Sequence, residues 1–126
     1  MVSFGLSTHR TEVVDAVIPI STAVSQVIDI GHYAIAGLIM PAAWTGASIG
    51  FLVSDTIGGT LVKLFDDDGN QVEVEALISQ GIGIDTDALV LAPWRFIQLQ
   101  SVTIGTPATP IVQAAERTIK LVLKAP

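Results

Sequence analysis

Strict alternation of apolar and polar residues is the main pattern in this chain. In residues 117–124, Ile119, Leu121 and Leu123 occupy every second position, and Lys120 lies between two of them. Because successive side chains of a β-strand point to opposite faces, this pattern predicts a strand with one buried side.

Seven further segments are predicted as strands, because they alternate in the same way or are short and rich in Val, Ile, Thr and aromatic residues. These segments are residues 24–30, 32–40, 48–54, 60–65, 71–75, 78–84 and 94–100. Turn-forming residues separate them: Gly31, Pro41, the Gly58-Gly59 pair, the Asp68-Gly69-Asn70 run and Gly105. A spacing of about 8–12 residues predicts an all-β fold, a single antiparallel β-sandwich of jelly-roll type in residues 23–126.

The N-terminal segment, residues 1–22, alternates little and is predicted to be an extended arm or an edge segment. It is too apolar for a freely solvated tail. Its large aliphatic residues are Val13, Val14, Val17, Ile18 and Ile20. We expect them to form an assembly arm on a neighbouring subunit, so that deleting residues 1–21 weakens assembly and spares the fold. One or two helical turns in residues 11–17 are the alternative.

Composition narrows the classes of partner. The 126 residues suffice for one domain, and only 14% of them are charged, against about 25% in an ordinary soluble domain. The net charge of -6 argues against nucleic acid and against a polybasic membrane patch. No uninterrupted apolar run is long enough to span a bilayer and no secretory signal is evident, so we expect a protein made in a cytoplasm.

No catalytic set is evident, and the chain is predicted not to be an enzyme. Cysteine is absent, which excludes thiolate catalysis and cysteine zinc sites. The two histidines, His9 and His32, have no partner at metal-ligand spacing. Asp85 and Asp87 are interpreted as a solvated turn rather than a glycosidase pair. No cofactor is expected.

An acidic run, Asp66-Asp67-Asp68-Gly69-Asn70, is the most conspicuous cluster. As a calcium loop it would place Leu64, which cannot ligate, at the first position. We interpret the run as a hairpin turn in which the Asp68-Gly69 pair and Asn70 supply positive φ angles. A surface cation site at Asp66 and Asp68 is the alternative.

Trp44 and Trp94 each follow a proline-containing segment. Exposed indoles could stack on sugar rings and serve as surface-binding aromatics. The favoured interpretation is that each one closes an end of the core, because a small sandwich needs large side chains there. The segment 105–110, with two prolines, is expected to be an exposed loop.

Six segments within residues 26–124 carry a family resemblance. They are 29–33 (Asp-Ile-Gly-His-Tyr), 36–45 (Ala-Gly-Leu-Ile-Met-Pro-Ala-Ala-Trp-Thr), 49–55 (Ile-Gly-Phe-Leu-Val-Ser-Asp), 64–69 (Leu-Phe-Asp-Asp-Asp-Gly), 94–101 (Trp-Arg-Phe-Ile-Gln-Leu-Gln-Ser) and 113–123 (Gln-Ala-Ala-Glu-Arg-Thr-Ile-Lys-Leu-Val-Leu). Together they resemble small virion structural proteins of tailed bacteriophages and prophages, most of all capsid decoration or cement proteins. The resemblance implies a β-sandwich on the capsid surface that binds the major capsid protein and is commonly a homotrimer.

Two functions are therefore weighed. The first is a non-enzymatic virion protein that decorates and reinforces the capsid by burying apolar surface between capsid subunits. The second is a glycan-binding or structural module of a phage tail or head fibre, which requires an exposed Trp44 or Trp94. A sugar hydrolase is disfavoured, because no acid–base constellation is evident.

Overall fold

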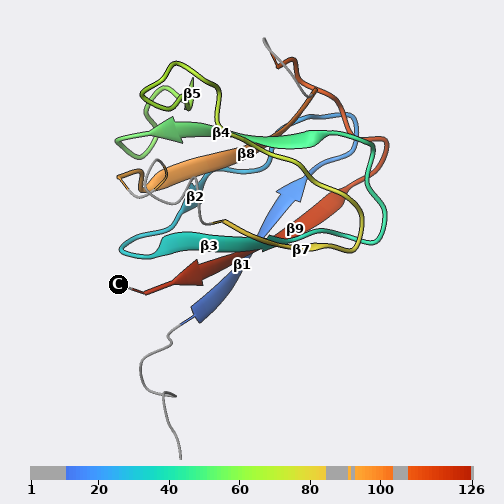
Figure 1. Ribbon diagram of the computed structural model, residues 1–126, viewed down its shortest axis with the longest axis horizontal. Coiled ribbons are helices and arrows are strands. Elements are labelled where there is room, and N and C mark those ends of the chain that lie inside the picture. The colour runs from blue at the N-terminus through green and yellow to red at the C-terminus, as the bar shows by residue number, and fades with distance from the viewer. Residues whose placement is uncertain (1–10, 85–90, 92, 104–107, 126) are drawn as a thin grey trace, which may run out of the picture.

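The computed structural model describes residues 11–84, 91, 93–103 and 108–125 (Figure 1). These residues form nine β-strands: β1 (Thr11–Ile18), β2 (Ile28–Asp29), β3 (Ala34–Ile39), β4 (Ser48–Ser54), β5 (Val62–Lys63), β6 (Glu73–Val74), β7 (Gly81–Gly83), β8 (Phe96–Val102) and β9 (Arg117–Lys124). The predicted all-β class is confirmed. In this described part, no helix has the length and apolar character that a membrane crossing needs.

The strands form two antiparallel sheets. Sheet A has the order β1-β9-β3-β7, and sheet B has the order β2-β8-β4-β5, with β6 also paired to β4. Strands β5 and β6 share one edge of β4, because β5 pairs with Leu52 and Val53 while β6 pairs with Ile49 and Gly50. Figure 1 shows the sheets as two layers, with β4 and β8 above β3 and β9. The predicted antiparallel sandwich is confirmed.

The strand pairing is nested along the chain. The first strand pairs with the last, β2 pairs with β8, β3 pairs with β7, and β4 pairs with β5 and β6. From the outermost pair of strands to the innermost, these pairings belong alternately to sheet A and to sheet B. This is the strand order of a jelly roll, in which two Greek keys pack face to face.

The core lies between the inner faces of the two sheets. On β9, Ile119 and Leu121 are fully buried and Lys120 between them is exposed, as the alternation predicts. Ile97 and Leu99 of β8 meet them from sheet B as members of the same cluster. Burying each of these side chains contributes about 1.5–3 kcal/mol, so the core accounts for most of the stabilisation.

The start of the described chain corrects two predictions. Residues 11–18 form β1, which pairs with β9 at all eight positions, so the helical alternative for residues 11–17 is wrong. Ala16 and Ile18 are fully buried in the core of their own chain. Residues 11–18 are therefore an edge strand of the sandwich, which agrees with the edge-segment alternative for residues 1–22 and extends the sandwich N-terminally of residue 23. Deleting residues 1–21 would remove an edge strand and would not spare the fold.

The free edge of β1 is partly closed by one side chain. The Gln26 amide donates to the carbonyl oxygen of Asp15 at 2.8 Å, and its oxygen accepts the N–H of Val17 at 2.9 Å. The amide thus imitates a neighbouring backbone and satisfies two groups that an edge strand leaves open.

The predicted exposed loop at residues 105–110 is only partly described. Residues 105–107 lie outside the described chain. Ala108 is buried, with 1% exposure, and its carbonyl accepts the Lys63 ammonium at 3.1 Å. The expectation of exposure is therefore wrong at Ala108, because the segment packs back on sheet B and Pro110 bridges Val102.

Candidate functional site

The acidic run forms the tip of the β5–β6 hairpin, as predicted. A bridge joins Phe65 and Gln71, and the N–H of Asp66 donates to the Asn70 carbonyl at 2.8 Å. Gly69 has φ of 82°, which favours glycine. Neither Asp68 nor Asn70 has a positive φ, so that part of the prediction is wrong.

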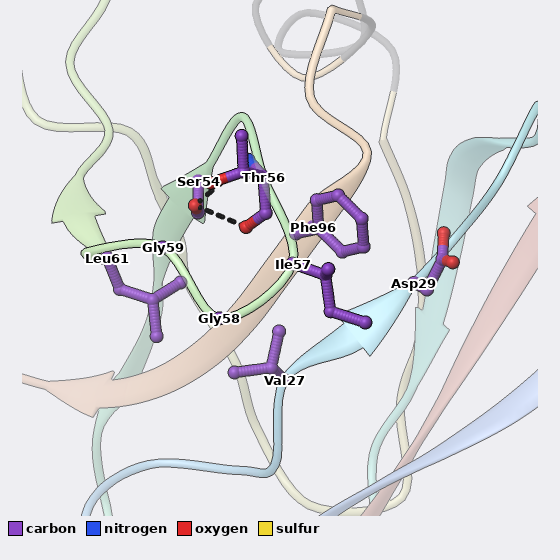
Figure 2. A pocket seen from close by; sticks show the side chains of 9 residues that line it. All are labelled: Val27, Asp29, Ser54, Thr56, Ile57, Gly58, Gly59, Leu61 and Phe96. Carbon is purple, nitrogen blue, oxygen red and sulfur yellow. Dashed lines mark hydrogen bonds between the residues drawn. The ribbon is translucent and has the colours of Figure 1, made fainter.

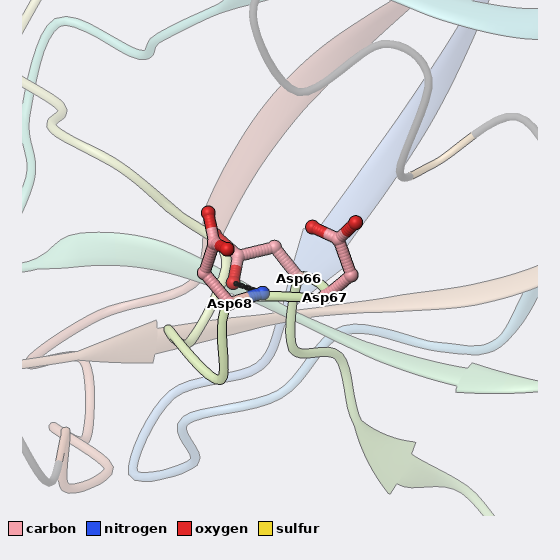
Figure 3. Close-up of side chains that lie close together, drawn as sticks. All are labelled: Asp66, Asp67 and Asp68. Atoms are coloured by element: carbon pink, nitrogen blue, oxygen red, sulfur yellow. Dashed lines mark hydrogen bonds between the residues drawn. The ribbon is translucent and has the colours of Figure 1, made fainter.

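The three aspartates at this tip offer carboxylate oxygens within 4.8 Å of one another. One Asp66 oxygen already accepts the N–H of Asp68 at 3.0 Å (Figure 3). The same oxygen accepts the N–H of Asn70 at 2.8 Å. These bonds hold the turn, and exposed acidic groups of this kind are common without an ion. The cation site at Asp66 and Asp68 stays a prediction.

Both tryptophans are half-buried and pack against the core. The Trp44 indole donates through Nε1 to the Ala47 carbonyl at 3.0 Å, which uses its only polar group within the chain. The backbone N–H of Trp94 donates to the Leu91 carbonyl at 3.1 Å. This packing supports a structural role at the ends of the core.

The five residues of the predicted assembly arm separate according to the faces of β1. Ile18 is buried in the core, while Val14 and Val17 are half-buried. Val13 is 55% exposed, and Ile20, just after the strand, is 60% exposed. Only these last two offer large apolar surface to another molecule.

A small apolar pocket lies at the end of sheet B, where the β4–β5 loop covers β8 (Figure 2). It holds about 160 Å³, close to the roughly 150 Å³ cavity that accommodates a benzene ring. Its apolar walls are Val27, Ile57, Leu61 and Phe96. Ile57 is 82% exposed and Val27 is 46% exposed, so the rim of the pocket is apolar as well.

The β4–β5 loop that forms this pocket has a defined geometry. The Ser54 hydroxyl donates to the Thr56 carbonyl at 2.8 Å, and Gly58 has φ of 70°. At Gly59 an added Cβ would clash with the Thr56 hydroxyl and would lie 2.6 Å from the Ser54 hydroxyl. Two glycines are therefore needed to close the loop in this form.

An ion pair flanks the pocket. The Arg95 guanidinium contacts the Asp29 carboxylate through Nε at 2.8 Å and through Nη2 at 3.0 Å, and it lies 5.2 Å from the Phe96 ring centre. The hydrogen bond from Arg95 and then that from Gly31 lower the pKa of Asp29, while Asp29 raises the pKa of Arg95. Asp29 is thus held ionised, which suits a recognition site rather than proton transfer near neutral pH.

Sequence reasoning did not find this pocket. Its walls come from three segments that are far apart in the chain, and only the exposed Ile57 beside two glycines marks it locally. Of the other candidates, His32 is exposed in the β2–β3 turn. His9, Asp85 and Asp87 lie outside the described residues.

Comparison with protein-family models, with curated proteins and with solved structures gives no match for this chain. The resemblance to phage virion proteins therefore stays a prediction.

Proposed function

We propose that the protein is a non-enzymatic structural protein of a tailed-phage virion. In this proposal it assembles in the bacterial cytoplasm, binds as a homotrimer between subunits of the major capsid protein, and reinforces the capsid surface.

One observation carries the proposal: the pocket at the end of sheet B lies within exposed apolar surface. Val27 and Ile57 expose large aliphatic side chains around a hollow of about 160 Å³. Apolar surface of this kind is typical of protein contact sites, and a pocket that takes one partner side chain is a usual hot spot. Burial there contributes about 25 cal/mol per Å² before the costs of association.

Electrostatics agree with a binding role. Asp29 is the titratable residue that lines this pocket, and its pairing with Arg95 lowers its pKa and so keeps it ionised. The proposal therefore assigns no catalytic residue and no cofactor. The net charge of -6 suits a protein partner better than nucleic acid or an anionic membrane.

The glycan-binding or fibre module remains the alternative function. It requires an indole face open to a sugar ring, whereas Trp44 and Trp94 both pack against the core. The geometry of the described residues does not favour it over the capsid role.

The test is co-sedimentation with expanded shells of the major capsid protein encoded in the same genome. We expect saturable binding at a fixed ratio, three copies at each threefold or quasi-threefold position. Ile57→Ser should weaken binding at least tenfold, because it removes the most exposed apolar side chain of the pocket rim. Val112→Ser is the matched control, since Val112 is 59% exposed and does not line the pocket.

No binding to the shells would overturn the capsid role. Tryptophan fluorescence that responds to host polysaccharide, together with absent shell binding, would favour the fibre module. Equal loss in the Ile57 and Val112 variants would remove the pocket from the proposal.

A further inference from the structure

The outward side of sheet A carries both apolar and basic side chains. Because Ile119 and Leu121 face the core, the alternate residues of β9 face outward, and cross-strand partners point to the same side. We call this surface the outer A face. Among its residues are Val13, Asp15, Ile39, Gly81, Gly83, Lys120 and Lys124.

Charge on the outer A face differs from that of the whole chain. Lys120 and Lys124 are both exposed there, and Asp15 is the acidic residue opposite Lys120. Val13 and Ile39 are 55% and 44% exposed beside them. In a chain of net charge -6, this face attracts an acidic partner with an apolar group.

Two glycines leave a shallow floor on this face. Gly81 pairs with Ile39 and Gly83 pairs with Gly37. A Cβ added at Gly81 or Gly83 would meet nothing within 4 Å, and neither has a positive φ. The open space beside Ile39 can receive an aromatic ring, and aromatic cover over sheet glycines is a known stabilising device.

The tip of the β5–β6 hairpin carries an aromatic ring and acidic side chains, which match the glycine floor and the lysines of the outer A face. Phe65 is 50% exposed and is followed directly by Asp66, Asp67 and Asp68. The ion pair found within the described residues joins Asp29 and Arg95, so it leaves the tip carboxylates unneutralised. The tip therefore offers an aromatic ring beside three negative charges.

Spacing allows both contacts at once. Ile39 pairs with Lys120 on one side and with Gly81 on the other. Adjacent strands lie about 4.8 Å apart, so Gly81 and Lys120 are separated by about 10 Å. If an aromatic side chain of a partner covers Gly81, the residues that follow it in the partner's chain lie within reach of the Lys120 ammonium.

We propose that the Phe65–Asp68 hairpin tip of one copy docks on the outer A face of a second copy. Phe65 covers the glycine floor, and the aspartates face Lys120 and Lys124. The tip belongs to sheet B and the face to sheet A, so each copy uses two different surfaces. A heterologous contact closes into a ring when the rotation between copies is a whole fraction of a turn, and a rotation of one third of a turn would give the trimer of the proposed function. The contact itself needs no capsid.

The experiment uses two charge-reversed forms of the full chain, measured by light scattering and sedimentation in low salt without capsids. In the tip variant, Asp67→Lys/Asp68→Lys, tip and face are both basic. In the face variant, Lys120→Glu/Lys124→Glu, both are acidic. We expect the unmodified chain to associate, and each variant alone to remain at 13.2 kDa.

An equimolar mixture of the two variants should associate again, because each basic surface then meets an acidic one. Raising the salt to 1 M should weaken the charged part of the contact, since the Debye length falls to about 3 Å. Glu75→Lys/Glu116→Lys has the same charge change as the tip variant at other exposed positions and should associate like the unmodified chain. Circular dichroism verifies the fold of every variant.

Gly83→Thr tests the glycine floor separately. It fills the open space without backbone strain and should lower the association constant at least tenfold, whereas Gly46→Thr, also in open space, should not. A monomeric unmodified chain, association that survives in both charge variants, or a mixture that stays monomeric would each overturn the proposal. Shell binding by a chain that fails these tests would leave the capsid role intact.

Discussion

Replacing Gln113 by Met tests how the buried end of the sandwich is held together. Gln113 is fully buried, and its side-chain oxygen accepts the N–H of Thr45 at 2.9 Å. Its amide nitrogen donates to the Thr45 carbonyl at 3.2 Å. The Gln113 oxygen also accepts a hydrogen bond from Arg117 Nε at 3.2 Å. Gln113→Met keeps the length of the side chain and removes all three bonds, so little of the expected loss comes from a cavity.

The expected loss of stability follows from the two orphaned groups of Thr45. A fully buried unpaired group costs about 1–3 kcal/mol, and Thr45 is half-buried, so we take about 1 kcal/mol for each and about 2 kcal/mol in total. For a chain of this length, Tm falls by about 4 °C per kcal/mol, which predicts a decrease of about 8 °C.

Urea unfolding followed by circular dichroism measures this change. Gln80→Met is the control, because Gln80 is exposed and its amide accepts a single exposed N–H, that of Leu77 at 3.1 Å. The control should change stability by no more than about 0.5 kcal/mol. A Gln113 variant as stable as this control would refute the reasoning that the amide organises this end.

Three further predictions concern the loop, the ion pair and β1. Gly59→Ala should destabilise by at least about 1 kcal/mol, because its Cβ meets two hydroxyls, whereas Gly46→Ala should not; equal Tm values would contradict this. The Asp29→Asn variant should have a lower free energy of unfolding than the unmodified chain at pH 6. Pairing lowers the Asp29 pKa below 3.8, so the stability that the ion pair contributes should be lost as pH falls from about 4 through the folded pKa. The difference in stability between the two proteins should therefore shrink over this range. Urea midpoints that differ equally at pH 6 and pH 2.5 would contradict this prediction. Deleting residues 1–18 should abolish or strongly weaken cooperative unfolding, since β9 then loses one neighbour; an unaltered transition would show that β1 is dispensable.

The strands that alternate cleanly were predictable from the sequence. β9 has apolar residues at every second position, and one face is buried, so periodicity and structure coincide. β1 was not predictable in the same way, because Val13-Val14 and Val17-Ile18 place apolar residues on both of its faces. Its conformation is decided by pairing with β9, about a hundred residues later in the chain.

The pocket could not be predicted from the sequence, because it depends on contacts between residues that are far apart in the chain. Asp29 and Arg95 are 66 residues apart, and neither lies in a motif that predicts their contact. Nested pairing brings β2 beside β8, and that pairing places them together. The segments that carry the family resemblance build mainly β3, β4, β8 and β9, and they also contain Asp29 and Phe96 of the pocket, but the strand pairing that brings these two residues together cannot be read from either segment alone.

The pairing of β1 with β9 has a consequence for synthesis of the protein. A ribosome adds about 5–20 residues per second, so β1 emerges roughly 5–20 s before β9 is complete. During that interval β1 lacks the neighbour with which it pairs at eight positions. Closure of sheet A therefore has to wait until β9 has been made, and the valines of β1 are the surface that a chaperone would meet on the nascent chain during that interval.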